Sequence, residues 1–254
     1  SSTVGFSLDH STTYDLDPTT NLTLPAGGLK FSIKINQYSS QINPSSEIYS
    51  GFLVYDPQNA LVTNANNAGN VVFDYFSNTA SFGATVKIDP SNPANYKVET
   101  AFGGGHHLHA VSLPVSSYLA NEIEVLLSPI ETGTNNIIIK VKDNVGNLLV
   151  NDSAPGVNLS RVLSHVFHGT EGESVIEFKE FSVDKLPRCT LPDPGNVTGY
   201  DISSCGQTGD LVSEPQCIPY CSIGESRTDA SGQTIPPLML CSGEGNPATF
   251  VGCN

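Results

Sequence analysis

The stretch "NEIEVLLSPIETGTNNIIIKVKDNVGNLLVND", residues 121–152, decides the fold of this chain. It contains three short segments rich in Ile, Val and Leu, at 121–129, 135–143 and 147–152, and turn-forming residues separate them. That arrangement is typical of β-strands joined by turns. The bridge "DNVGN" between the last two segments supplies Asn and Gly where a tight hairpin needs positive φ. The stretch therefore predicts three strands, the last two of them joined as a hairpin.

The same pattern extends toward the N-terminus. Residues 29–38, "LKFSIKINQY", alternate apolar and polar side chains, which is the period of a sheet with one buried face. Helix signals are sparse, and we expect at most one or two short helices, within 116–127 or as a turn within 158–169. Regular strands with short turns predict an all-β fold, an antiparallel sandwich or barrel. The remaining predicted strands lie at 48–56, 70–76, 81–89 and 95–102.

Two segments, residues 121–152 and "SVIEFKEFSVDKL" at 174–186, carry a resemblance to a known fold family. These segments resemble the second half of concanavalin-type jelly rolls, the group that includes laminin-G-like, galectin-like and legume-lectin-like sandwiches. The resemblance implies a jelly-roll β-sandwich over residues 1–188. It implies a fold and no activity, because such sandwiches host hydrolases, lectins and adhesive modules alike. The closing strand carries the apolar positions Val175, Ile176, Phe178, Phe181, Val183 and Leu186.

All six cysteines lie in the last 66 residues, and residues 1–188 contain none. An even number in so short a tract predicts up to three disulfides formed in an oxidising compartment. Zinc binding is the competing interpretation, but there is no second close cysteine pair and no histidine beyond position 168. The sequence does not choose among the 15 pairings. The cysteines are Cys189, Cys205, Cys217, Cys221, Cys241 and Cys253.

The cysteine-rich tract begins after a proline-rich hinge, "KLPRCTLPDP". Its cysteine spacing, the "GY" before the second cysteine and the "FVGC" ending resemble the sushi-like repeats of large extracellular proteins of microbial eukaryotes. Six cysteines in place of four depart from an ordinary sushi module. We therefore expect a second unit at 189–254, a small disulfide-rich β module that depends on its crosslinks.

Secretion is the expected fate of the chain. It starts with Ser1, as a mature form does after removal of a signal segment. Four Asn-x-Ser/Thr sequons also predict an extracellular glycoprotein. Their acceptors are Asn21, Asn151, Asn158 and Asn196.

The charge balance excludes two classes of partner. The formal net charge is -14, from 11 basic and 25 acidic residues spread along the chain. A nucleic-acid backbone or an anionic membrane surface would be repelled almost everywhere. No run of about 18 apolar residues occurs, so we expect no membrane insertion.

Three of the six histidines lie in "GGGHHLHA", residues 103–110. A polar strand is the favoured interpretation of this segment, since only His107 and His109 would share one of its faces. The weak metal hypothesis adds His165 and His168, which "HVFH" would place on one side of a helical turn. No spacing here matches a known ligand motif.

Glu122 and Glu124 form a candidate carboxylate pair for catalysis. Residues two apart on a strand point the same way, and paired carboxylates serve glycoside hydrolysis. One jelly-roll hydrolase family uses Glu-x-Asp-x-x-Glu, but here the second acid is Glu124 and the third position is Leu126 or Leu127. The chain also has no Trp to stack against a sugar. We therefore predict no catalytic residue and no enzyme.

Calcium is left open as a cofactor, because a hard cation needs only clustered oxygen ligands. The candidate ligands in or beside loops are Asp15, Asp17, Asp56, Asp74, Asp89 and Asp143.

Two functional hypotheses follow from the sequence. The first is a secreted, non-enzymatic structural or adhesive subunit of a surface layer, fibre or appendage, whose partners are further copies of itself or other extracellular proteins. The alternative is a lectin-like module that binds glycans, with or without calcium.

Overall fold

The structure is a computed structural model that describes eighteen strands and most of the cysteine-rich tract. The described residues are 6–9, 12–19, 25–38, 48–55, 81–88, 96–102, 105–111, 122–129, 135–143, 145–157, 159, 162–170, 175–222 and 237–253.

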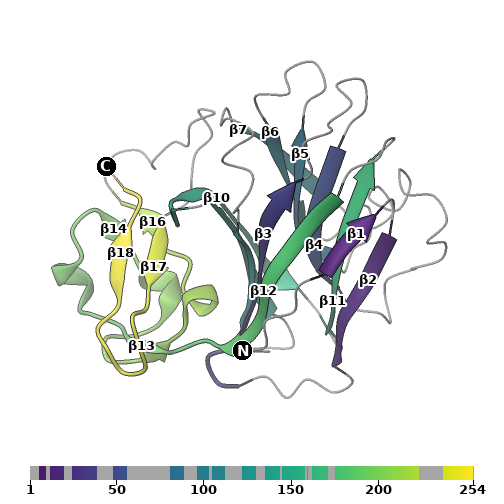
Figure 1. Ribbon diagram of the computed structural model, residues 1–254. Helices are drawn as coiled ribbons and strands as arrows, with labels where there is room; N and C mark the ends of the chain where they lie inside the picture. The colour runs from purple at the N-terminus through teal and green to yellow at the C-terminus, as the bar shows by residue number, and fades with distance from the viewer. Residues whose placement is uncertain are drawn as a thin grey trace.

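Two six-stranded antiparallel sheets form a sandwich, which confirms the predicted all-β fold (Figure 1). Sheet A has the order β1-β12-β3-β8-β9-β10 and sheet B the order β2-β11-β4-β5-β6-β7. The strands of sheet A are β1 (Phe6–Asp9), β3 (Leu29–Tyr38), β8 (Glu122–Leu127), β9 (Asn135–Lys142), β10 (Leu148–Val157) and β12 (Val175–Lys185). Those of sheet B are β2 (Thr12–Thr19), β4 (Ile48–Tyr55), β5 (Ser81–Ile88), β6 (Tyr96–Phe102), β7 (Gly105–Val111) and β11 (Val162–Thr170).

The core of the sandwich follows from the period-two pattern of the strands. Sheet A turns alternate side chains of β3, β8 and β9 inward, and β4, β5 and β6 of sheet B do the same from the other side. Phe52 and Phe181 meet edge-on between the sheets, with ring centroids 6.1 Å apart. The buried side chains of this layer include Phe31, Ile33, Phe82, Val98, Ile123, Val125, Ile137, Ile139 and Val141.

The hairpin predicted at "DNVGN" joins β9 to β10. The N–H of Asp143 donates to the carbonyl of Asn147 at 2.9 Å, and Gly146 adopts a φ of 88°. A side chain at position 146 would be strained at that φ, so glycine is the residue that lets the two strands turn back on each other.

The sequence allows for at most one or two short helices, and none forms in the described parts of the two candidate segments. Residues 122–127 are strand β8 and residues 162–170 are strand β11, each held between two neighbouring strands. Among the described residues, helix occurs only as three 3₁₀ turns in the cysteine-rich tract. Backbone pairing along a whole sheet outweighs the weak local preference for a helical turn.

The described part of the cysteine-rich tract, residues 189–222 and 237–253, has its own small core, and we call it the module. Its elements are β13 (Cys189–Thr190), η1 (Pro194–Asn196), β14 (Tyr200–Asp201), η2 (Ser203–Cys205), β15 (Leu211–Val212), η3 (Glu214–Gln216), β16 (Tyr220–Cys221), β17 (Leu238–Leu240) and β18 (Thr249–Val251). Three disulfides crosslink it, as predicted: Cys189–Cys241, Cys205–Cys217 and Cys221–Cys253. The buried core comprises Cys189, Cys205 and Cys217 together with Leu191, Ile202, Val212, Met239 and Ala248.

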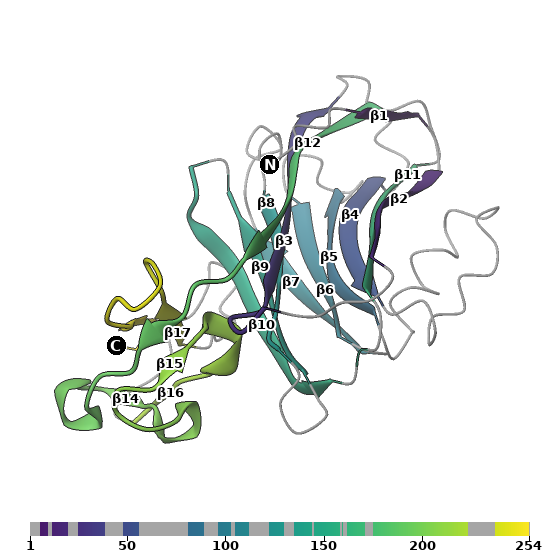
Figure 2. The same ribbon diagram turned by 90° about the horizontal axis from the view of Figure 1, so that it is seen from below.

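The module lies against sheet A, on the side away from sheet B (Figures 1 and 2). The short connection after β12 is held by the loop 25–28. The N–H of Leu186 donates to the carbonyl of Gly28 at 3.0 Å, and a Cβ on Gly27 would lie 2.0 Å from the carbonyl oxygen of Leu186. Only glycine permits this close approach, which fixes where the chain leaves the sandwich.

None of the helices in the described part of the chain is long and apolar enough to cross a membrane.

Candidate functional site

The outer face of sheet A, opposite the sandwich core, carries charged side chains in register. One row across the sheet runs Ser32, Glu124, Lys140 and Asn151, from β3 through β8 and β9 to β10. The next row brings together Lys34, Glu122 and Lys142. Among the side chains that the structure describes, Lys30, Lys34, Lys140 and Lys142 lie on this one face, a cluster of basic residues in an acidic chain.

Glu124 is the centre of this charged face. Its side chain is only 4% exposed, yet its two carboxylate oxygens face two ammonium groups. Lys142 Nζ lies 2.7 Å from Oε2, and Lys30 Nζ lies 3.6 Å from Oε1. A buried carboxylate is costly unless it is paired, so the two lysines are what keep Glu124 in this position.

Lys142 also reaches a second carboxylate, since its Nζ lies 3.8 Å from Glu122 Oε2. Beyond Glu122, Lys34 donates a hydrogen bond to Glu180. That hydrogen bond raises the pKa of Lys34; burial opposes the change, while the charges of Glu180 and Glu122 add to it. The face is thus a connected network of alternating charge.

The module covers one end of the charged face. Its 3₁₀ turn η3 packs on β8 and β9. Glu214 of that turn forms an ion pair with Lys140, whose ammonium group donates a hydrogen bond to it. The two side chains are 7% and 13% exposed. Among the described residues, this is the ion pair that joins the module to the sheet.

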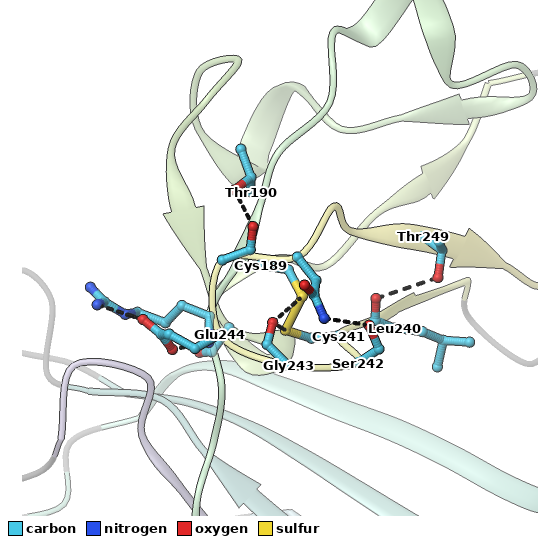
Figure 3. The surroundings of a disulfide bond; sticks show 12 residues. Cys189, Thr190, Leu240, Cys241, Ser242, Gly243, Glu244 and Thr249 are labelled. Atoms are coloured by element: carbon cyan, nitrogen blue, oxygen red, sulfur yellow. Dashed lines mark hydrogen bonds and ion pairs between the residues drawn. A yellow bond between two sulfur atoms is a disulfide. The ribbon is translucent and has the colours of Figure 1, made fainter.

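A second ion pair joins Arg188, the residue before the module, to Glu244 of the module, which Figure 3 labels near the Cys189–Cys241 disulfide. Glu244 accepts hydrogen bonds from the backbone N–H of Arg188 at 2.7 Å and from its guanidinium at 2.7 and 3.0 Å. The backbone hydrogen bond and then the side-chain ones lower the pKa of Glu244. Together with Cys189–Cys241, this contact holds the connection close to β17.

Between the module and the outer face of sheet A lies a cleft of about 750 Å³. This size falls within the range of small-molecule sites. One wall is charged and is formed by Lys30, Glu124, Lys140, Lys142, Asp184, Lys185 and Glu214. The apolar lining side chains are Leu126, Leu148, Leu186, Leu238, Leu240 and Val251.

The cleft offers strong hydrogen-bond donors and acceptors side by side. Lys30 and Lys142 are 31% and 25% exposed and border the buried Glu124, so a ligand entering the cleft meets ammonium groups with a carboxylate beneath them. Ammonium groups donate to hydroxyl oxygens and carboxylates accept from hydroxyl protons. A neutral, hydroxyl-rich molecule can therefore use both kinds of group.

The histidines of the metal hypothesis are not brought together by the sheet. His107 and His109 lie on β7, at the edge of sheet B, whereas His165 and His168 lie on β11. β4, β5 and β6 separate those two strands, a distance of about 19 Å at the usual strand spacing. His165 and His168 also occupy positions of opposite parity on a strand, since residues 162–170 do not form the expected helical turn.

The aspartates proposed as calcium ligands do not form a cluster in the described part of the chain either. Within the described ranges, no group of three or more His, Cys, Asp or Glu side chains is arranged to hold a metal ion. Asp15 and Asp17 lie on β2, and Asp56, Asp74 and Asp89 lie outside the described residues. Asp143 closes the β9–β10 hairpin instead, accepting hydrogen bonds from the N–H groups of Val145 and Asn147 at 3.0 and 2.8 Å.

The predicted glycosylation acceptors lie in different surroundings. Asn196 is exposed on η1 of the module. Asn151 is 4% exposed, because its row places it beside Lys140 on the outer face of sheet A. A glycan on Asn151 would have to displace its neighbours. Asn21 and Asn158 lie outside the described residues.

Sequence reasoning missed the lysines of the cleft and Glu214. The signal was present, because Lys30 and Lys34, Glu122 and Glu124, and Lys140 and Lys142 each occupy alternate positions of a predicted strand. Charges two residues apart on three neighbouring strands predict one charged face. Glu214 carries no such signal, since it is 74 residues from its partner and lies in a turn.

Comparison with known proteins returns no matching family model and no similar curated protein. Solved structures are similar at low identity. An alginate lyase from Chlorella virus has 11% identity and a TM-score of 0.39, covering 72% of this chain and 84% of its own. A β-1,3-1,4-glucanase (lichenase) derived from a mouse hindgut metagenome has 10% identity and a TM-score of 0.36, covering 71% and 78%.

A third similar structure is a protein of unknown function with a galectin-like fold from Bacillus subtilis, at 8% identity and a TM-score of 0.37, covering 71% of this chain and 77% of its own. The chain is an antiparallel jelly-roll β-sandwich, which confirms the predicted fold class. The sushi-like resemblance of the module stays a prediction.

The comparisons contradict the expectation of a non-enzymatic structural or adhesive subunit. The solved structures that they return include alginate lyases, a lichenase and a glucuronan lyase, and these are enzymes. That expectation depended on the lack of a recognisable motif. A site assembled from several strands and a distant turn leaves no contiguous motif to recognise.

Proposed function

We propose that this chain is a secreted, carbohydrate-active protein and that saccharide binds in the cleft between sheet A and the module. The observation that carries the proposal is Glu124, a buried carboxylate set between the ammonium groups of Lys30 and Lys142 on the wall of the cleft. Sugar hydroxyls both donate and accept, so one saccharide unit matches such a pair of groups.

The balance of charge in the cleft favours a ligand of this kind. Each carboxylate of the charged wall has a basic neighbour or a hydrogen-bond donor: Glu124 and Glu214 are ion-paired, and Asp184 accepts from Ser182 at 2.7 Å. A highly charged ligand would have to break these pairs. Hydroxyl groups can instead join the network by replacing water.

Secretion is supported by the three disulfides, which are stable in an oxidising compartment. The exposed position of Asn196 makes it the glycosylation site that we propose first. Self-association stays a prediction that the fold does not address.

A polysaccharide panel with the purified protein tests the proposal. Affinity electrophoresis measures binding, while new reducing ends report hydrolysis and absorbance of unsaturated products reports elimination. We expect retention by at least one polysaccharide, and a loss of roughly tenfold in affinity in Lys142→Met, since a charged hydrogen bond contributes about 1.5 to 3 kcal/mol.

Lys185→Met is the matched control, because this exposed lysine lines the cleft but does not contact Glu124 in any ion pair found among the described residues. Equal losses in the two variants would point to a general charge effect. A protein that neither binds nor alters any saccharide would overturn the proposal.

A further inference from the structure

The wall of the cleft that faces sheet A is a hairpin of the module. β17 and β18 pair with Leu238 opposite Val251 and Leu240 opposite Thr249, and all four residues line the cleft. Met239 and Phe250, at the alternate positions, belong to the module's own core. One face of the hairpin therefore holds the module together and the other is presented to the cleft.

That presented face is apolar and accessible. Leu240 and Val251 are 40% and 42% exposed, and they are two of the five large hydrophobic residues classed as exposed in the described part of the chain. Figure 3 shows Leu240 and Thr249 together beside the Cys189–Cys241 disulfide, with Thr249 Oγ1 donating to the carbonyl of Leu240 at 3.4 Å. The disulfide fixes this wall at its base.

The cleft thus has the lysines and Glu124, with Leu126 and Leu148 among them, on the side of sheet A, and a largely apolar hairpin on the side of the module. A ligand that uses both must be amphipathic across its thickness. Pyranose rings have this property, because hydroxyls project from the ring edge while axial C–H bonds form apolar faces. Burial of such a face against Leu and Val is favourable in proportion to its area.

Ring stereochemistry decides how continuous the apolar face is. In a β-linked gluco-configured ring every hydroxyl is equatorial, so both faces consist of C–H bonds alone. A manno- or galacto-configured ring places one hydroxyl axially and interrupts one face. A hydroxyl pressed against Leu240 or Val251 would lose its hydrogen bonds to water.

We propose that the β17–β18 hairpin makes the cleft selective for β-linked gluco-configured saccharides, whose C–H faces lie on Leu240 and Val251 while their edge hydroxyls meet Lys142 and Glu124. This inference rests on the proposed saccharide site and names the class of sugar that the site prefers. The module is then part of the binding site and the source of its specificity.

Isothermal titration with cello- and laminari-oligosaccharides against manno-oligosaccharides of equal length tests the inference. We expect the wild-type protein to bind at least one of the gluco-configured series on the order of tenfold more tightly. In Leu240→Ser/Val251→Ser the preference should fall to about twofold or less, mainly through weaker binding of the glucan.

Leu211→Ser is the matched control, since Leu211 is 42% exposed, like Val251, but is not among the residues that line the cleft. It should leave both affinities unchanged. Val251→Thr keeps the side-chain shape and strand propensity and provides a milder polar change should the double variant fold poorly. Thermal melting of each variant verifies folding.

The outcomes separate the two proposals. Equal affinity for both sugar series in the wild type, or a preference that survives the double variant, overturns the role of the hairpin and leaves the saccharide site standing. The absence of binding to every saccharide overturns both.

Discussion

Glu244 joins Arg188, the last residue of the connection, to the loop behind β17 through three hydrogen bonds donated by Arg188. These bonds favour the ionised carboxylate, so its pKa in the folded protein lies below the ordinary value of 4.5. Proton linkage then makes the contact pH-dependent, with a sign that follows from the direction of the change.

We expect the module to lose stability as the pH falls below about 4.5. A lowered folded-state pKa contributes stability that is present above the unfolded-state pKa and disappears as the pH drops through the folded value. Glu244→Gln should therefore melt lower than the wild type at pH 7, and the difference should disappear as the pH falls through the folded-state pKa of Glu244. Calorimetric melting across this range is the measurement, and a constant difference at every pH would contradict the linkage.

Asp143 responds to acid for a related reason in the sandwich. Burial alone raises the pKa of its carboxyl, but hydrogen bonds from the side chain and N–H of Asn147, and from Val145 and Gly146, outweigh burial and lower it. In the module, hydrogen bonds from Ser203 lower the pKa of Asp201. Several carboxyl groups therefore contribute to the loss of wild-type stability with falling pH. Glu244→Gln should reduce this pH dependence without removing it.

At the scale of elements, the contact between η3 and sheet A is decisive, because it places one wall of the cleft against the other. Lys140 and Glu214 form this contact as a buried ion pair. Removing one partner of such a pair leaves an uncompensated charge, whereas replacing both with apolar groups is often neutral.

We predict that Glu214→Leu destabilises the docked module by about 3 kcal/mol and that Lys140→Met/Glu214→Leu recovers most of this loss. Urea unfolding followed by limited proteolysis of the 186–188 connection measures the effect. If the double variant is as unstable as the single one, the ion pair itself, and not the buried lysine, would be what holds η3 in place.

Most strands of the sandwich could be predicted from the sequence because the signal, a pattern of apolar side chains bounded by turn residues, lies within each segment. The segments predicted at 29–38, 48–56, 81–89 and 135–143 coincide with β3, β4, β5 and β9 to within a residue. The helical turn at "HVFH" was wrong for a physical reason: Val162–Thr170 finds partners on both sides, β2 and β4, which are distant in sequence. Local propensity contains no information about such partners.

The cleft was harder to predict than the fold. Glu122 and Glu124 were correctly placed on one face of a strand, but they were judged against a catalytic motif and not against the lysines on β3 and β9. The hairpin that faces sheet A comes from residues 238–251, more than a hundred positions away from Lys30 and Glu124. Such a site exists only after the module has docked.

At the scale of the whole molecule, all three disulfides lie inside the module, and residues 1–188 contain no cysteine. The module has a small core, so its stability depends on these crosslinks. The sandwich has a core of its own between two sheets. The two units should therefore differ in their response to reduction.

We predict that Cys205→Ser/Cys217→Ser lowers the stability of the module by about 3 kcal/mol and leaves the sandwich transition within error of the wild type. Hydrogen exchange resolved by peptide separates the two units. The control is the wild type with a reductant, in which the module alone should exchange fast. Loss of protection in β3, β8 and β9 as well would show that the units unfold together, against the division proposed at residue 188.

The confinement of the crosslinks to one end also determines how the chain answers a mechanical load. When the chain is pulled from its two termini, the module can lengthen only slightly. Its disulfides connect cysteines that are 52, 12 and 32 residues apart in the sequence. The sandwich has no such shortcut, so nearly all of the extension comes from unzipping its sheets. Stretching would separate the strands of sheet A that line the cleft while the β17–β18 hairpin opposite stayed intact. A ligand bound in the cleft would then be released under tension.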